Sequence, residues 1–212
     1  MDWEQPKVYA VRHKNEEVRA ASRSGGIFTA ISDWVFGNKG VVYGCVLTGD
    51  FSAVHIRADC ADGRNKMRGS KYIQSRLRNT FNSVKADLLE KRTVLFTGTS
   101  CQIAGLKGFL GRNYDNLICV DIVCHGVPSI RVWRAYLDWQ GARNGALVKD
   151  ADFRNKKDFG WHEHMETLTL NNGKKINSAI FKELFYGHMI LRPSCYVCPY
   201  KSTVHPGDIT IG

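Results

Sequence analysis

Two short apolar segments, each followed at once by small polar residues and a further helix-like segment, constrain the fold of this chain most strongly. Residues 93–97 precede a Gly-Thr-Ser stretch at residues 98–100, and the almost continuously apolar residues 116–124 precede a short loop at residues 125–129. Uninterrupted apolar runs are typical of strands that are buried on both faces of a parallel sheet. We therefore predict an α/β fold in which a largely parallel sheet is flanked by helices.

The other segments extend this prediction. We expect helices at residues 27–36, 80–91, 130–140 and 179–190, and a further helix that ends near residue 110. We expect strands at residues 8–13, 40–47, 53–58, 148–154, 163–170, 174–178 and 207–212. An Asn-Asn-Gly turn at residues 171–173 joins two of the later strands as a hairpin. Residues 1–212 are therefore predicted to form a single domain with an appended antiparallel strand region, which is subdivided, if at all, near residue 145.

Cysteine spacing gives the first indication of chemistry. Cys195 and Cys198 are two intervening residues apart in a loop between two prolines. This spacing fits half of a zinc site, half of an iron–sulfur site or a redox dithiol, and it does not choose among them. Cys101 and Cys124 each fall just beyond the carboxyl end of a predicted strand, where ligands collect in open α/β sheets. We expect these four thiols to converge on one metal centre.

The bulk composition narrows the class of protein. The chain has seven cysteines, an odd number spread over 212 residues, which favours reduced thiols over a disulfide scaffold. The first six residues have no basic segment followed by an apolar one, and no apolar run is long enough to span a membrane. We therefore predict a cytoplasmic location. The formal net charge of +10 favours an anionic partner, but no nucleic-acid-binding motif accompanies it, so nucleic acid is not the expected partner.

Three small-residue loops are candidates for binding the anionic part of a cofactor. A loop that leads into a helix presents free amides and the positive end of the helix dipole, and a neighbouring cation adds charge. The candidate residues are Ser24, Gly25, Gly26, Ser70, Lys71, Tyr72, Gln74, Gly98, Thr99 and Ser100. An ordinary capped turn is an equally good interpretation of the first loop. No Gly-x-Gly-x-x-Gly fingerprint is present, so a Rossmann-type dinucleotide site finds no support.

Three histidines stand in suggestive positions. His125, directly after Cys124, is a candidate proton relay, although a structural histidine that closes the turn is an equal alternative. His162 and His164 would share one face of a strand, but two histidines at this spacing are weak evidence for a metal site. A solvated strand edge is the preferred interpretation of that pair.

Six of these segments, in this order, resemble one known family. They are Ser24-Gly-Gly26, Gly69-Ser-Lys-Tyr72 with Gln74-Ser75, residues 96–105, residues 124–129, Cys195-Tyr-Val-Cys198 and residues 208–212. The family is the coenzyme F420 hydrogenase/dehydrogenase beta-subunit family, which includes beta subunits of deazaflavin-reducing hydrogenase and formate dehydrogenase and plant 7-hydroxymethyl chlorophyll a reductase. The resemblance covers nearly the whole chain.

The resemblance implies an iron–sulfur flavoprotein with FAD and a 4Fe-4S cluster. Such a protein passes electrons between a ferredoxin-like or hydrogenase/dehydrogenase partner and a hydride-carrying small molecule such as coenzyme F420. Cys101, Cys124, Cys195 and Cys198 are then the four thiolate ligands that such a cluster needs. The small-residue loops would hold FAD.

The chain departs from the family pattern in two ways, and two other functions stay open. Family members often carry an N-terminal ferredoxin-like module, which is missing here, so the electron donor is expected to be another protein or a missing segment. The family pattern continues beyond residue 212, so we expect a chain truncated at its C-terminus. One alternative is a non-catalytic electron-transfer subunit without a competent flavin site. The other is a zinc-stabilised basic binding module.

Overall fold

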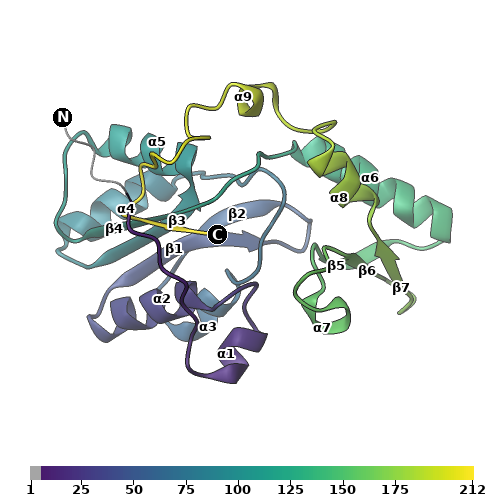
Figure 1. Cartoon of the computed structure of the whole chain (residues 1–212), viewed down its shortest axis with the longest axis horizontal. Helices are drawn as coiled ribbons and strands as arrows, with labels where there is room; N and C mark the ends of the chain where they lie inside the picture. Colours follow the sequence, from purple (N-terminus) through teal and green to yellow (C-terminus); the bar gives the residue numbers. More distant parts are fainter. Residues whose placement is uncertain (1–5) are drawn as a thin grey trace.

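The computed structural model describes residues 6–212, and its main element is a five-stranded sheet in the order β2-β1-β3-β4-β8 (Figure 1). The strands are β1 (Val41–Leu47), β2 (Ala53–Ala58), β3 (Val94–Thr99), β4 (Leu117–Ile122) and β8 (Ile209–Ile211). β1, β3, β4 and β8 are parallel, and only β2 is antiparallel to its neighbour. The predicted α/β fold with a largely parallel sheet is confirmed.

Helices cover both faces of this sheet. Around it lie α1 (Glu16–Ala20), α2 (Ile27–Gly37), α3 (Ala61–Asn65), α4 (Thr80–Leu89) and α5 (Ser100–Leu110). Neighbouring residues of β3 alternate between the two faces, as a strand requires. Phe96 packs with α4 and α5 on one face, whereas Leu95 packs with α2 on the other. Because both faces are buried, the strand reads as a continuous apolar run.

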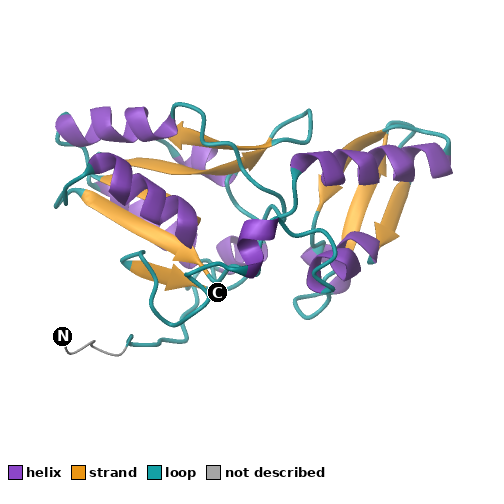
Figure 2. Cartoon of the chain, turned by 90° about the horizontal axis from the view of Figure 1, so that it is seen from above, coloured by secondary structure: helices purple, strands orange, loops and turns teal. Residues whose placement is uncertain are grey.

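The second half of the chain forms a smaller antiparallel sheet in the order β5-β6-β7, beside the main sheet in Figures 1 and 2. Its elements are α6 (Ile130–Asn144), β5 (Val148–Asp152), α7 (Lys156–Phe159), β6 (Glu166–Leu170), β7 (Lys175–Ser178) and α8 (Ile180–Tyr186). Trp133 of α6 is fully buried against Phe153, with ring centroids 4.4 Å apart, and against Phe181, 4.8 Å away. The appended antiparallel strand region of the predicted fold is confirmed.

The chain then returns to the main sheet. Figure 1 shows it leaving α8, passing through α9 (Pro193–Tyr196) and running back to β8. β8 pairs with β4, with Ile209 opposite Val120 and Ile211 opposite Ile122. This return brings the Cys195 loop back to the sheet that carries Cys101 and Cys124.

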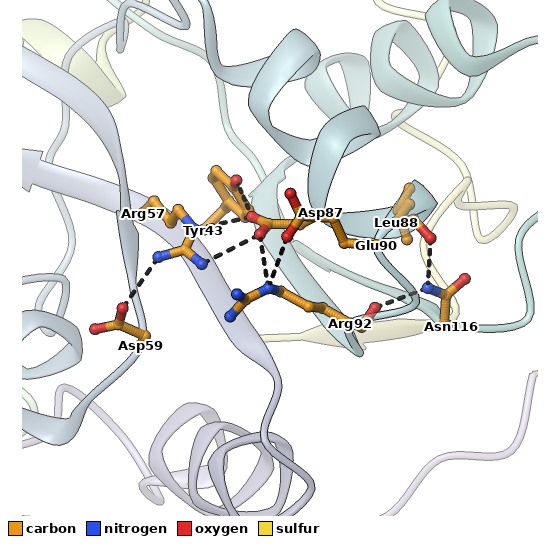
Figure 3. A network of polar contacts seen from close by, with 8 residues as sticks. All are labelled: Tyr43, Arg57, Asp59, Asp87, Leu88, Glu90, Arg92 and Asn116. Atoms are coloured by element: carbon orange, nitrogen blue, oxygen red, sulfur yellow. Dashed lines mark hydrogen bonds and ion pairs between the residues drawn. The ribbon is translucent and has the colours of Figure 1, made fainter.

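A buried carboxylate ties α4 to the hairpin formed by β1 and β2 (Figure 3). Asp87 accepts a hydrogen bond from the Tyr43 hydroxyl at 2.5 Å and two from Arg57, at 2.9 and 3.1 Å. Arg92 adds an ion pair at 3.5 Å. These bonds fix the helix that packs over one face of the sheet.

Three expectations differ from the structure or fall outside it. The predicted strand at residues 8–13 is wrong, because this segment pairs with no strand and Val8 and Tyr9 are 89% and 73% exposed. Its main-chain contact is instead from the His13 amide to the Gly25 carbonyl, at 2.7 Å. The predicted helix at residues 179–190 ends earlier, at Tyr186. The expectation that no targeting segment is present was based partly on residues 1–5, which lie outside the described residues. From residue 6 onward, no helix has the length and apolar character needed to cross a membrane.

Candidate functional site

The four cysteines come from three segments. Cys101 lies in the first turn of α5, directly after β3, and Cys124 lies two residues beyond the end of β4. Cys195 belongs to the short helix α9, and Cys198 follows that helix. Since β3 and β4 are parallel neighbours, Cys101 and Cys124 leave the same edge of the sheet.

A main-chain contact brings the α9 segment to the loop after β4. Pro128 and Leu191 form an isolated antiparallel bridge, and the Arg192 amide donates to the Val127 carbonyl at 3.0 Å. Gly126 has φ +139°, and a Cβ there would lie 3.0 Å from Leu191 Cδ1 and 3.3 Å from Cys195 Cβ. Glycine at this position therefore permits the close approach of the two cysteine-bearing segments.

Cys124 has the other three predicted ligands, Cys101, Cys195 and Cys198, among its electrostatic neighbours. The pKa of the Cys124 thiol is raised to about 11, mainly by burial; Cys101, Cys195 and Cys198 act in the same direction, and a hydrogen bond from the Gly126 amide opposes them. A bound metal would oppose this effect by favouring the thiolate forms. Four thiols is the number of ligands that a 4Fe-4S cluster requires. Within residues 6–212, no three His, Cys, Asp or Glu side chains are placed to hold one metal ion, and the ligand assignment stays a prediction.

The segment after the cysteine loop is attached to the sheet by a buried aspartate. Asp121 is fully buried and accepts hydrogen bonds from His205 Nδ1 at 3.0 Å and from Thr210 Oγ1 at 2.7 Å. Ser100 Oγ lies 3.1 Å from the same His205 nitrogen. A hydrolase triad needs the two ring nitrogens to serve the serine and the aspartate separately, so this group is a structural anchor.

The loop at residues 98–100 is largely occupied by its own contacts. Ser100 is only 3% exposed and is engaged by His205. The Thr99 amide donates to Gln102 Oε1 at 3.0 Å, which satisfies one of the free donors at the start of α5. A Cβ at Gly98 would lie 2.9 Å from the same Gln102 oxygen. Phosphate binding by this loop remains a prediction that would require some of these contacts to open.

The first candidate loop is more accessible. Gly26 is the N-cap of α2, with φ +84°, and no side chain caps the helix there. Ser24 is exposed and Gly25 is partly exposed, whereas Gly26 is buried. The first amides of an uncapped helix remain available to an anionic ligand.

The loop around Lys71 is held by the lysine itself. Lys71 Nζ donates to the carbonyls of Met67, Arg68 and Gly69 at 2.8, 2.9 and 2.9 Å, so all three of its donors are used. Burial lowers the pKa of this amine to about 8. In this arrangement Lys71 shapes the loop and offers no free N–H group to a ligand.

The other predicted residues of this loop face its neighbours. Ser70 and Gln74 are exposed, and the Gln74 amide donates to the Pro128 carbonyl at 3.1 Å, which joins this loop to the one that follows Cys124. The Tyr72 ring packs against His164, with centroids 4.6 Å apart, and against Phe185 at 5.4 Å. Tyr72 therefore packs against the segment before β6 and against α8.

A row of aromatic rings, formed by Tyr72, His164, Tyr186 and His125, connects that loop with the cysteines. His164 lies 5.3 Å from Tyr186, and Tyr186 lies 5.1 Å from His125, between ring centroids. His125 is exposed and directly follows Cys124, so its position is compatible with the predicted proton relay. His162 is exposed, whereas His164 is half-buried and precedes β6, so this pair is not a solvated strand edge. Burial, reinforced by Arg154 and Arg23, lowers the pKa of His164 to about 4.

Arg23 is a residue that the sequence reasoning missed. Its Nη1 donates to the Arg154 carbonyl, while Nε and Nη2 are buried and have no partner among the described residues. The sequence predicts the cation of the anion-binding loops at Lys71 instead. The available signal was an arginine directly before the Ser24-Gly25-Gly26 turn.

Comparisons with known proteins identify the family and the fold of this chain. A family model that describes the C-terminal part of the beta subunits of coenzyme F420 hydrogenase/dehydrogenase matches residues 91–212. No curated protein matches the chain. Among solved structures, a chain from a xenon-derivatised F420-reducing [NiFe] hydrogenase complex of Methanosarcina barkeri is similar, with a TM-score of 0.59 and 17% sequence identity. The match covers 90% of this chain and 66% of that one, and at this identity it shows a shared fold.

Proposed function

Because this chain belongs to the coenzyme F420 hydrogenase/dehydrogenase beta-subunit family, we propose that it is an iron–sulfur flavoprotein of an oxidoreductase system. It would transfer electrons between a partner iron–sulfur protein and a hydride-accepting small molecule such as coenzyme F420. The observation that carries this proposal is geometric: Cys101 and Cys124 leave one edge of the sheet, and the segment that bears Cys195 is bridged to the loop after Cys124. Four thiolates are what a 4Fe-4S cluster requires.

The proposed cofactors divide the chemistry between them. When bound, the cluster carries single electrons, and FAD exchanges electron pairs with a hydride carrier. The chain's own residues bind and orient these groups. Cys101, Cys124, Cys195 and Cys198 would ligate the cluster. The loop at Ser24-Gly25-Gly26, in which Ser24 is exposed, and the ring of Tyr72 would contact the flavin.

His125 is the proposed proton carrier. Its ring packs on His188, Phe185 and Tyr186 at centroid distances of 4.7, 4.9 and 5.1 Å, which restrict its orientation. An imidazole nitrogen gains and loses a proton near neutral pH. His125 would hold a proton at such a nitrogen, next to Cys124.

Exposed apolar side chains around the cysteine segments support a protein partner. Val123, Tyr196 and Val197 are 69%, 49% and 79% exposed, and each lies within one or two residues of a predicted ligand. Apolar surface gathered at one place is typical of a protein interface. We propose that the electron-transfer partner covers these residues.

One observation favours a non-catalytic electron-transfer subunit as the second candidate. Lys71 and Ser100, both predicted to bind the cofactor, are already engaged by other groups of the chain. A chain that keeps these contacts would bind flavin weakly. No contact among the described residues favours the zinc-stabilised module.

An anaerobic electron-transfer assay tests the proposed function. The purified protein, supplied with FAD, is reduced with dithionite, freed of excess reductant and mixed with coenzyme F420 while absorbance is followed. We expect reduction of the coenzyme at up to one equivalent per electron pair held by the protein, and loss of this transfer without FAD. A protein that carries reducing equivalents but passes none to any hydride acceptor tried would favour the non-catalytic subunit.

A further inference from the structure

The guanidinium group of Arg23 has two buried nitrogens, Nε and Nη2, that have no hydrogen-bond partner among the described residues. Its Nη1 is anchored by the Arg154 carbonyl, but Nε and Nη2 are shielded from water and form no hydrogen bond within residues 6–212. No carboxylate of the described chain forms an ion pair with Arg23. Buried donors on a cation are normally satisfied, so this edge needs an explanation.

The two free nitrogens are adjacent on the guanidinium. Nε–H and one N–H of Nη2 point in nearly parallel directions, which is the fork that matches two oxygens of a carboxylate or a phosphate. The bond from Nη1 to Arg154 fixes the plane of this fork. The free edge of Arg23 is therefore oriented before any ligand arrives.

The segment that carries Arg23 is itself held in place. Lys156 Nζ, in α7, donates to the carbonyls of Arg19 and Ser22 at 2.9 and 3.1 Å. Arg154 is fixed through its own Nη2, which donates to the Trp161 carbonyl at 3.0 Å. The position of the Arg23 guanidinium is thus fixed by contacts between two distant parts of the chain, residues 19–23 and 154–156.

The charge around this edge is mainly positive. Burial lowers the pKa of Arg23, and the neighbouring Arg154 lowers it further. Burial also lowers the pKa of Lys156, and Arg23 and Arg19 add to that effect. The acidic neighbour, Asp152, accepts the Arg154 amide at 3.0 Å. An incoming anion would relieve the repulsion among these cations.

Aromatic side chains adjoin the same place. Tyr72 and Tyr186 are both near enough to influence the pKa of Arg23, and both rings contact His164, at 4.6 and 5.3 Å between centroids. A cation beside flat rings suits a ligand that combines an oxyanion with a ring system. Both the flavin and the hydride carrier of the proposed function have this character.

We propose that Nε and Nη2 of Arg23 bind a phosphate or carboxylate group of a ring-bearing ligand, in the neighbourhood of Tyr72, Tyr186 and His164. The inference rests on the proposed function in naming two sources of this oxyanion, the FAD pyrophosphate or an acidic group of the hydride carrier. The fork itself depends only on the contacts of Arg23.

A binding experiment with inorganic pyrophosphate tests the fork directly. Calorimetric titrations would compare the wild-type protein with Arg23→Gln, Arg23→Lys and the control Arg143→Gln. Arg143 is exposed and lies over the Trp139 ring, so this control makes the same change in net charge. We expect at least tenfold weaker binding in Arg23→Gln, an intermediate loss in Arg23→Lys and wild-type affinity in the control. Equal affinity in all four proteins, or no binding to the wild type, would overturn the proposal.

A second measurement needs no variant and so does not depend on the folding of Arg23→Gln. Phenylglyoxal modifies arginines, and mass spectrometry would follow the rate at Arg23 and Arg143 of the wild-type protein. We expect pyrophosphate to slow modification at Arg23 several-fold and to leave Arg143 unchanged. Equal rates at Arg23 with and without pyrophosphate would contradict the site.

Flavin binding then identifies the source of the oxyanion. If the FAD pyrophosphate occupies the fork, Arg23→Gln weakens binding of FAD but not of riboflavin, which lacks phosphate. If the hydride carrier occupies it, FAD affinity is unchanged and KM for the carrier rises. An unchanged FAD affinity together with an unchanged KM would refute both assignments. A protein that binds pyrophosphate through Arg23 but transfers no electrons would contradict the proposed function and leave the anion site standing.

Discussion

Nδ1 of His205 lies 3.0 Å from Oδ2 of Asp121, and this bond joins the segment after the cysteine loop to the strand before Cys124. Asp121 is fully buried in β4, and its second oxygen accepts from Thr210 of β8 at 2.7 Å. Gly207 makes the approach possible, since a Cβ there would lie 2.8 Å from Asp121 Oδ1. One carboxylate therefore fixes both ends of the predicted cluster-binding region.

Replacement of Asp121 by alanine tests this role. We expect Asp121→Ala to lower the free energy of unfolding by about 1–3 kcal/mol, because the partners of the carboxylate lose their hydrogen bonds. Hydrogen exchange should accelerate at residues 199–212 more than in β1 or β3. The exposed Asp115→Ala serves as the control and should match the wild type. Unchanged exchange at residues 199–212 in Asp121→Ala would show that the anchor is not needed.

A methyl group at Gly126 should separate the cysteine segments. We expect Gly126→Ala to cost about 1–3 kcal/mol of stability, because the position has φ +139° and the new Cβ meets Leu191 and Cys195. The control Gly108→Ala lies in α5 with no heavy atom within 4 Å of its Cβ, and should be stabilising by about 0.5–1 kcal/mol. Urea denaturation measures both changes. Equal stability of the two variants would contradict the close packing inferred at Gly126.

The Asp87 network should make stability depend on pH in the acidic range. Burial acts to raise the pKa of Asp87, but hydrogen bonds from Arg57 and Tyr43 outweigh it, and the pKa is lowered from its ordinary value of 3.8. The stabilisation is therefore fully present above about pH 3.8 and is lost as the pH falls below that value. We expect Asp87→Asn to lose about 1–3 kcal/mol near neutral pH and progressively less in acid. A difference from the wild type that stays constant with pH would contradict this assignment.

Glu166 should make the stability of the fold depend on pH in the opposite direction to Asp87. Burial raises the pKa of this carboxyl from 4.5 to about 8, although the Tyr136 hydroxyl donates to it at 2.6 Å. Between these values the unfolded chain loses its proton while the folded chain keeps it, so stability falls as the pH rises from about 4.5 to about 8. We expect Glu166→Gln to remove this fall, whereas the exposed Glu163→Gln keeps it. Denaturation curves across that range give the comparison, and parallel pH profiles for Glu166→Gln and the wild type would refute it.

The parallel sheet was predictable because its strands are buried on both faces, which leaves a continuous apolar run at residues 94–96. The same local signal led to a wrong prediction at residues 8–13, since a short apolar segment becomes a strand only where a partner strand offers free hydrogen bonds. The sequence cannot state which sheet edge is free. Here the segment lies against the Gly25 loop instead.

The candidate site was predictable only in part, for a related reason. The position of Cys101 and Cys124 at one edge of the sheet follows from strand order, because neighbouring parallel strands end at the same edge. Lys71 and Arg23 could not be distinguished from the sequence, since each is a cation beside a glycine-containing loop. Tertiary contacts show which cation has donors left for a ligand. Lys71 donates all three of its N–H groups to carbonyls of its own loop, whereas Arg23 donates only Nη1, to the carbonyl of the distant Arg154.

Metal and flavin content, determined on one anaerobically purified sample, is the most direct test of the proposed iron–sulfur flavoprotein. We expect about four irons and four sulfides per chain with one FAD, as a 4Fe-4S flavoprotein requires. Cys195→Ser should lose most of the iron, whereas the exposed Cys60→Ser, outside the predicted ligand set, should keep it. Zinc in place of iron, with neither sulfide nor flavin, would contradict the proposed function.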